Sequence, residues 1–149
     1  MTKAVREPLS SPGPVPDLQP DAMIRKTGST PFHGNDVYAT RSGQRSTATL
    51  RRTGETTTAV VRIQNDGSVA DRFTVRRHAT QGPFEVRLRL PKGVKTSPLL
   101  APGESWTVRI RVTRTRAVDA GDVVQVRAVA RSATDAARRD AVWLRVRAR

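Results

Sequence analysis

The two histidines are the side chains best suited to catalysis or metal binding, since the chain contains no cysteine. A zinc site or a histidine-based catalytic site needs several ligands or partners that converge. Neither His33 nor His78 has an aspartate, a glutamate or another histidine at ligand spacing within a strand or helix. Without cysteine, disulfide bonds and thiolate metal sites are excluded as well. The sequence therefore predicts no catalytic residue, no metal site and no cofactor.

Residues that could supply oxygen ligands to Ca²⁺ occur in the first part of the chain. They are Asp17, Asp21 and the run Gly34-Asn35-Asp36. Their spacing does not match a calcium-binding loop. Glycine, asparagine and aspartate are also the residues that reverse a chain at low cost. We expect this run to form a turn rather than to bind a cation.

Arginine dominates the charge of the protein. The chain has 27 Lys+Arg against 13 Asp+Glu, a formal net charge of +14, and lysine occurs at only four positions. Such a charge attracts phosphates, acidic lipid surfaces and acidic protein patches alike, and a GC-rich genome would also enrich arginine. Seven arginines alternate with apolar residues, so we expect them to project from the outer faces of sheets and to contact a partner. They are Arg87, Arg89, Arg109, Arg111, Arg127, Arg145 and Arg147.

Three roles compete for these outward arginines. They can remain solvated and paired with scattered acids, where each pair contributes little. They can bind carboxylates of a partner in bidentate geometry, for which arginine is better suited than lysine. They can also bind phosphates, but few aromatic residues accompany them and no nucleic-acid-binding motif is present. We therefore do not expect nucleic acid to be the partner, and the first two roles stay open.

Apolar residues recur at every second position in the stretch from residue 56 to residue 75. A period of two predicts strands, because successive side chains of an extended chain point to opposite faces. The run Asn65-Asp66-Gly67-Ser68 lies between the two strand patterns and predicts a chain reversal. The residues expected to face inward are Ala59, Val61, Ile63, Phe73 and Val75.

The same pattern of strand, polar turn and strand continues along the chain. It predicts further strands at residues 21–26, 47–51, 84–90, 106–112, 123–131 and 141–149. Residues 133–139 are expected to form a loop or a single turn. Seven to eight strands without helical periodicity are typical of an antiparallel β-sandwich, in which the inner faces of two sheets interdigitate. A closed barrel is the alternative, which the uneven loops and strand lengths disfavour.

Proline marks the N-terminal end of the chain as a separate segment. Five prolines between residues 8 and 20 fix the backbone φ angle and remove amide donors. We therefore divide the chain into an extended Pro-rich arm, residues 1–19, and one domain, residues 20–149. Residues 27–47 form a long loop within the domain, and loops of this length are usually functional or ordered by contacts. The arm residues expected to contact a partner are Pro12, Pro14 and Pro16.

Two turn motifs carry a resemblance to a known family. One is V-x-I-x-N-D-G from Val61 to Gly67, and the other is L-x-P-G-E-S from Leu100 to Ser105, which precedes a V-x-I-x-V strand. In these residues the chain resembles the bacterial immunoglobulin-like modules of the NEW3 and CARDB type, and the resemblance extends over residues 19–149. It implies an immunoglobulin-like sandwich that spaces, sticks to or decorates other proteins and has no catalytic residues. Such modules occur in secreted, surface and virion proteins.

Together these patterns predict a non-enzymatic structural protein that docks on other subunits of a larger assembly, with self-association left open. The expected form is a capsid decoration protein on the virion surface of a bacteriophage, made in the host cytoplasm. The N-terminus lacks the apolar core of a signal peptide, and no apolar run reaches the ~20 residues that span a bilayer. The alternatives are a secreted or cell-surface adhesion module and a basic binder of polyanions or nucleic acid.

Overall fold

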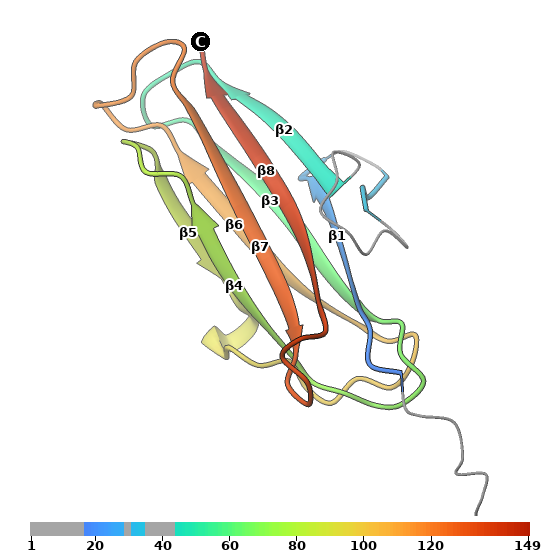
Figure 1. The fold of residues 1–149 in the computed structure, drawn as a ribbon. Coiled ribbons are helices and arrows are strands. Elements are labelled where there is room, and N and C mark those ends of the chain that lie inside the picture. The colour runs from blue at the N-terminus through green and yellow to red at the C-terminus, as the bar shows by residue number, and fades with distance from the viewer. Residues whose placement is uncertain (1–16, 29–30, 35–43) are drawn as a thin grey trace, which may run out of the picture.

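The protein folds as two β-sheets packed face to face, with strands that run along the long axis of the molecule (Figure 1). The computed structural model describes residues 17–28, 31–34 and 44–149. The all-β sandwich of seven to eight strands expected from the sequence is confirmed. The described residues form the strands β1 (Pro20–Lys26), β2 (Arg45–Leu50), β3 (Thr56–Asn65), β4 (Phe73–Ala79), β5 (Glu85–Arg89), β6 (Ser105–Thr113), β7 (Val123–Ser132) and β8 (Arg139–Ala148).

Each sheet contains four strands. The order is β1-β3-β6-β5 in the first, sheet A, and β2-β8-β7-β4 in the second, sheet B. Neighbouring strands are antiparallel, except that β2 runs parallel to β8. Sheet B is thus mixed, where the sequence predicted only antiparallel neighbours. Parallel pairing requires a long connection, and five other strands separate β2 from β8 along the chain, so alternation within either strand could not reveal it.

A single hydrophobic core fills the space between the sheets, as the period-two pattern predicted. In sheet A, Val61 of β3 lies opposite Val108 of β6, and both are almost completely buried. In sheet B, Val126 of β7 lies opposite Leu144 of β8, and neither has any exposed surface. Burying one such side chain contributes about 1.5–3 kcal/mol. The branched aliphatic residues of both inner faces therefore hold the two layers together.

The turn after β3 carries the chain from sheet A to sheet B. It does not close a hairpin, because β3 pairs with β1 and β6 whereas β4 pairs with β7. Asn65, the last residue of β3, is completely buried. Its Nδ2 donates hydrogen bonds to the carbonyl oxygens of Val69 (2.9 Å) and Leu100 (2.8 Å), and its Oδ1 accepts one from the Gly67 amide (2.9 Å). The predicted reversal is present as a corner between the layers.

Residues 17–19 lie against the same turn. The Ser68 amide donates to the carbonyl oxygen of Asp17 (2.8 Å), and the Asp17 amide donates to Ser68 Oγ (2.8 Å). The Asp66 amide donates to the carbonyl oxygen of Gln19 (2.9 Å). A Cβ atom at Gly67 would lie only 2.2 Å from the carbonyl oxygen of Asp17. Glycine at this position therefore permits the close approach of the two segments.

Replacing Gly67 by alanine is expected to displace residues 17–19 and to leave the core intact. The added methyl group overlaps backbone that cannot move without breaking both Ser68 hydrogen bonds. We expect a loss of about 1–2 kcal/mol of stability, together with faster hydrogen exchange at the Ser68 amide. Gly82→Ala is the matched control, since no atom lies within 4 Å of a Cβ atom there. Unchanged protection of the Ser68 amide in Gly67→Ala would contradict the expected displacement.

The connections between strands contain little regular structure. Residues 133–139, expected to form a loop or a single turn, contain no helix between the end of β7 and the start of β8. One short 3-10 turn, η2 (Pro91–Gly93), follows β5. Within the described ranges, no helix has the length and apolar character needed to cross a membrane.

Candidate functional site

Arginine side chains project from the outer faces of both sheets. For each of the seven arginines predicted from the sequence, the residues immediately before and after it on the strand point inward. They belong to the buried core or, on β5, pack against its edge. Sheet A carries Arg87 and Arg89 on β5 and Arg109 and Arg111 on β6. Sheet B carries Arg127 on β7, with Arg145 and Arg147 on β8.

Four of these arginines face one another across β5 and β6. Arg87 lies opposite Arg111, and Arg89 lies opposite Arg109 in the antiparallel register. Arg87, Arg89, Arg109 and Arg111 are called the arginine cluster below, and all four are exposed. Directly opposed residues have Cβ atoms about 4.5–5.5 Å apart, and like charges at this spacing destabilise a sheet. The cluster therefore costs stability unless an anion lies between the guanidinium groups.

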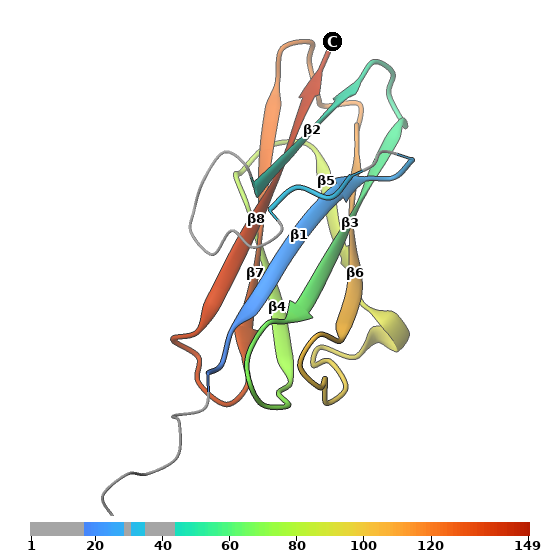
Figure 2. The same cartoon turned by 90° about the vertical axis from the view of Figure 1, so that its right-hand side faces the viewer.

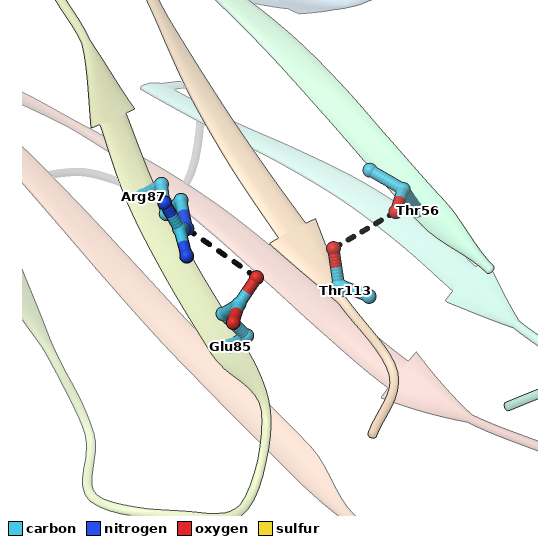
Figure 3. Close-up of polar contacts among 4 residues, drawn as sticks. All are labelled: Thr56, Glu85, Arg87 and Thr113. Atoms are coloured by element: carbon cyan, nitrogen blue, oxygen red, sulfur yellow. Dashed lines mark hydrogen bonds and ion pairs between the residues drawn. The ribbon is translucent and has the colours of Figure 1, made fainter. Parts of the chain in front are cut away.

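One carboxylate of the chain reaches the edge of the cluster. Glu85 Oε1 lies 3.3 Å from Arg87 Nε (Figure 3), in the one ion pair found among the described residues. Both side chains are at least half exposed, so the pair contributes at most about 1 kcal/mol. Beside it, the hydroxyls of Thr56 and Thr113 join β3 to β6 at 2.8 Å. A hollow of about 210 Å³ opens here between Glu85, Arg87, Arg89, Arg111 and Thr113.

Other acidic side chains are engaged in turns at the ends of the sandwich. Glu55 accepts hydrogen bonds from the backbone amides of Arg51 (2.6 Å) and Arg52 (3.1 Å), and these bonds lower its pKa. Glu104 and Asp122 each accept a backbone amide from a residue three positions earlier. None of these turn carboxylates forms an ion pair with an arginine of the cluster within the described residues. The positive charge of the faces is therefore not balanced by the acids of these turns.

The strands of sheet B contain a single acidic residue, Asp140, and it is buried with 3% of its surface exposed. Its carboxylate accepts hydrogen bonds from the Ala22 amide (2.8 Å), Gln44 Nε2 (2.7 Å) and the Ala141 amide (2.9 Å). Burial raises the pKa of Asp140 to about 6, outweighing the opposite effect of these hydrogen bonds. Asp140 therefore joins β8 to β1, and the outward rows of the four strands of sheet B carry no acid.

Further arginines extend the basic surface of sheet B beyond the predicted set. Arg131 of β7 lies opposite Arg139 of β8, a third pair of opposed like charges. Arg127 lies opposite Trp143, and its guanidinium carbon is 5.9 Å from the centroid of the indole ring. Arg131 could have been predicted from the sequence, because it lies four positions after Arg127 on the same strand and therefore faces the same side. The partner strand was needed to place Arg139.

An aromatic residue from a loop adds to the outer face of sheet A. Phe32 lies against Arg25 and Arg62, whose guanidinium carbons are 4.8 and 4.4 Å from the ring centroid. The neighbouring residue His33 pairs with Ile24 through two backbone hydrogen bonds of 2.7 and 2.9 Å. Residues 31–34 therefore lie along the edge of β1 and cover it.

The remaining residues considered from the sequence do not assemble into a site. His33 and His78 are exposed and belong to different sheets, and no group of three His, Asp or Glu side chains able to hold a metal occurs in the described ranges. Asp17 is exposed at the turn after β3, whereas Asp21 is buried. Asn35, Asp36, Pro12, Pro14 and Pro16 lie outside the described residues, as does much of the predicted loop 27–47.

No protein-family model matches the chain, and no curated protein matches it in sequence. Several solved structures are similar in fold. The PapD-like domain 7 of human CEP192, an ASH / PapD-like domain, has a TM-score of 0.51 at 12% identity, covering 99% of this chain and 98% of that one. The FixG-related protein from Vibrio parahaemolyticus has a TM-score of 0.46 at 10% identity, covering 64% and 81%. The secreted serine protease VesC from Vibrio cholerae has a TM-score of 0.47 at 13% identity over 68% of this chain, which spans only 21% of the length of VesC.

The match to the PapD-like domain over nearly the whole of both chains defines the fold class. The protein is an immunoglobulin-like β-sandwich, as the sequence predicted. At 12% identity the likeness concerns the fold alone. The narrower resemblance to NEW3 and CARDB modules is not confirmed and stays a prediction.

Proposed function

We propose that the chain is a non-enzymatic docking domain whose arginine cluster binds carboxylates on the surface of a larger assembly. One observation carries the proposal: the fold holds Arg87 opposite Arg111 and Arg89 opposite Arg109, and a single carboxylate among the described residues forms an ion pair with them. Opposed like charges cost stability in the free chain. The same arrangement becomes favourable once partner carboxylates lie between the guanidinium groups, because charge-assisted bidentate pairs are among the stronger polar contacts.

Carboxylates suit the cluster better than nucleic acid does. Binding of single-stranded nucleic acid usually combines basic residues with aromatic rings on which bases stack. The residues of β3 that lie opposite Arg109 and Arg111 are Val60 and Thr58, and the outward residue of β6 that precedes Arg109 is Thr107. These positions offer no stacking surface beside the cluster. Planar guanidinium groups remain well matched to carboxylates.

The non-enzymatic part of the proposal is supported by the environment of Asp140, whose carboxyl group is buried and hydrogen-bonded within the fold. Asp140 has a raised pKa, which is often a mark of a catalytic acid. It is enclosed between β1 and β8, and it accepts two backbone amides and one side-chain amide. With 3% of its surface exposed, Asp140 is not open to a substrate. A structural role accounts for its environment.

The particular assembly that we propose is the virion surface of a bacteriophage, on which the chain would act as a capsid decoration protein. Two features support this form. The turn motifs resemble modules that occur in virion proteins, and arginines on both outer faces would let one domain contact two neighbours at once. The second form is a secreted or cell-surface adhesion module, which the same turn motifs also favour.

Charge reversal within the cluster tests the docking function. Tagged wild-type protein and the double variant Arg109→Glu/Arg111→Glu are mixed with virions or cell envelopes from the source organism and separated on a density gradient. We expect the wild type to sediment with one of these particles and the variant to bind at least about tenfold more weakly, which corresponds to about 1.4 kcal/mol. Arg52→Glu/Arg138→Glu is the matched control, because it changes the net charge equally at exposed turns.

The outcomes of this experiment are distinct. Binding that survives the Arg109→Glu/Arg111→Glu reversal would contradict the docking function. Binding that disappears after nuclease treatment of the particles would instead assign the basic faces to nucleic acid. Sedimentation with virions or with cell envelopes decides between the two forms of the proposal.

A further inference from the structure

The two long sides of the sandwich differ (Figures 1 and 2). On one side, β1 lies near β8 and β2, and the hydrogen bond from the Ala22 amide to Asp140 Oδ2 joins the sheets. Residues 31–34 cover the outer edge of β1 there. β4 and β5 lie along the opposite side, and within the described chain no hydrogen bond connects them. The sandwich is therefore closed along one side. On the other side, residues 96 and 97 bind only the start of β4, and the rest of that side, along β5, is open.

β5 has a free edge on this open side. Among the described strands it pairs only with β6, so alternate residues direct their N–H and C=O groups away from the sheet. Its inward side chains Val86 and Leu88 are only partly buried, unlike Val61 and Val108 in the middle of the same sheet. Part of the core surface beneath β5 is thus left uncovered.

A groove runs along the free edge, between β5 and β4. Arg77 of β4 and the residues Val86, Arg87, Leu88 and Arg89 of β5 line an open hollow of about 330 Å³. Arg77 occupies the inward-facing row of β4, opposite Ala128 of β7, where an apolar residue would continue the core. The groove continues past Ala79 and Phe84 in a second hollow of about 500 Å³. It combines an apolar floor with arginines on both walls.

We propose that the free edge of β5 receives an extended, acidic segment of a partner protein as an additional strand of sheet A. The inference rests on the docking function proposed above and locates the partner carboxylates. Added strands gain affinity from main-chain hydrogen bonds and specificity from alternate side chains. On the outer face, acidic residues of the segment would lie beside Arg87 and Arg89. On the inner face, apolar residues would cover Val86 and Leu88, with Arg77 opposite.

Charge and backbone chemistry disfavour the other occupants. A second copy of the chain would place its own Arg87 and Arg89 on the same face as those of the first copy, which repels. The N-terminal arm has prolines at positions 8, 12, 14 and 16, which remove amide donors that a strand needs. A partner segment that alternates acidic and apolar residues meets both the charge and the pattern of the groove.

A synthetic peptide tests this inference with the full-length chain. The probe is a fluorescein-labelled nine-residue peptide of alternating glutamate and valine, titrated at low salt and followed by fluorescence anisotropy. We expect saturable binding, slower hydrogen exchange at the outward amides of β5, and at least tenfold weaker binding to Arg87→Glu/Arg89→Glu. The matched control Arg52→Glu/Arg138→Glu should bind like the wild type. If the first variant does not fold, Arg77→Glu on the other wall of the groove provides the same test.

Two comparison ligands separate strand addition from simple charge attraction. The first has the same composition with glutamates and valines in separate blocks, and the second is single-stranded oligothymidylate. Equal binding of either ligand, or binding without protection of β5 amides, overturns strand addition. Failure of the alternating peptide, with sedimentation still lost in Arg109→Glu/Arg111→Glu, overturns strand addition but not docking by the cluster. Binding of the peptide with β5 protection supports strand addition even if sedimentation proves independent of the cluster.

Discussion

Replacing Asn65 by aspartate is expected to destabilise the protein by about 4 kcal/mol at neutral pH. The side-chain amide of Asn65 donates to the carbonyl oxygens of Val69 and Leu100 in a completely buried corner. Aspartate would place a carboxylate oxygen against both carbonyl oxygens. The Val69 carbonyl would lose its side-chain donor, whereas the Leu100 carbonyl would keep the Asp71 amide (3.0 Å) as its donor. Each unsatisfied buried group costs about 1–3 kcal/mol, and a charged one costs more. A lower midpoint in urea denaturation measures the loss.

The pH dependence of Asn65→Asp provides a second readout. Burial and the two carbonyl oxygens should raise the pKa of the new carboxyl group, so its penalty is largest above that pKa and shrinks as the pH falls through it. We therefore expect partial recovery of stability towards pH 4. Gln64→Glu is the matched control, because the Gln64 amide makes one exposed hydrogen bond of 3.3 Å to the carbonyl oxygen of Gly103. It should change stability by less than about 0.5 kcal/mol, and an equal loss in both variants would contradict the role of Asn65.

Replacing Asp140 by alanine is expected to cost about 3 kcal/mol at pH 4, where the carboxyl group contributes most to stability. The carboxylate is the acceptor for the Ala22 and Ala141 amides and for Gln44 Nε2. Gln44 Nε2 keeps a second acceptor, the carbonyl oxygen of Ala141 at 2.7 Å, so the backbone amides account for most of the loss. The Ala22 hydrogen bond also joins the two sheets. Thermal unfolding of Asp140→Ala should therefore show reduced stability together with faster exchange of the Ala22 amide.

Asp140 also predicts how stability changes with pH. Its pKa is raised in the folded protein to about 6 from 3.8, so its contribution is most favourable below pH 3.8 and is lost as the pH rises through about 6. The full change is at most about 3 kcal/mol, at 1.36 kcal/mol per pKa unit. We expect the stability difference between wild type and Asp140→Asn to decrease from pH 4 to pH 7 in urea denaturation. A difference that grows over this range would show that hydrogen bonding outweighs burial.

The strands could be predicted because each inner face repeats apolar residues with a period of two, as at Val61 and Val108. Their pairing could not be predicted in the same way. The parallel neighbours β2 and β8 share no local signal, since the contact joins distant parts of the chain. The turn at Asn65 predicted a reversal correctly, but turn residues alone do not say whether the next strand returns to the same sheet or crosses to the other.

The arginines of the candidate site could be predicted individually but not as a cluster. Alternation places Arg87 and Arg111 on outer faces, whereas their opposition depends on the register of β5 against β6. The position of Arg77 could not be predicted. It lies in the inward-facing row of β4, where the alternating pattern predicts an apolar residue rather than a charged one. The open side of the sandwich is what accommodates it, and a single sequence does not reveal an open side.

The position of β8 between β2 and β7 has a consequence for biosynthesis. A nascent polypeptide emerges from the ribosome in chain order, so β2 and β7 become available before the strand that links them. Sheet B cannot be completed until residues 139–148 have left the exit tunnel, although β4 and β7 can pair earlier. Until then the aliphatic inner surface of sheet A faces an incomplete layer, and transiently exposed surface of this kind promotes aggregation. We therefore expect stalled translation products that lack β8 to require chaperones.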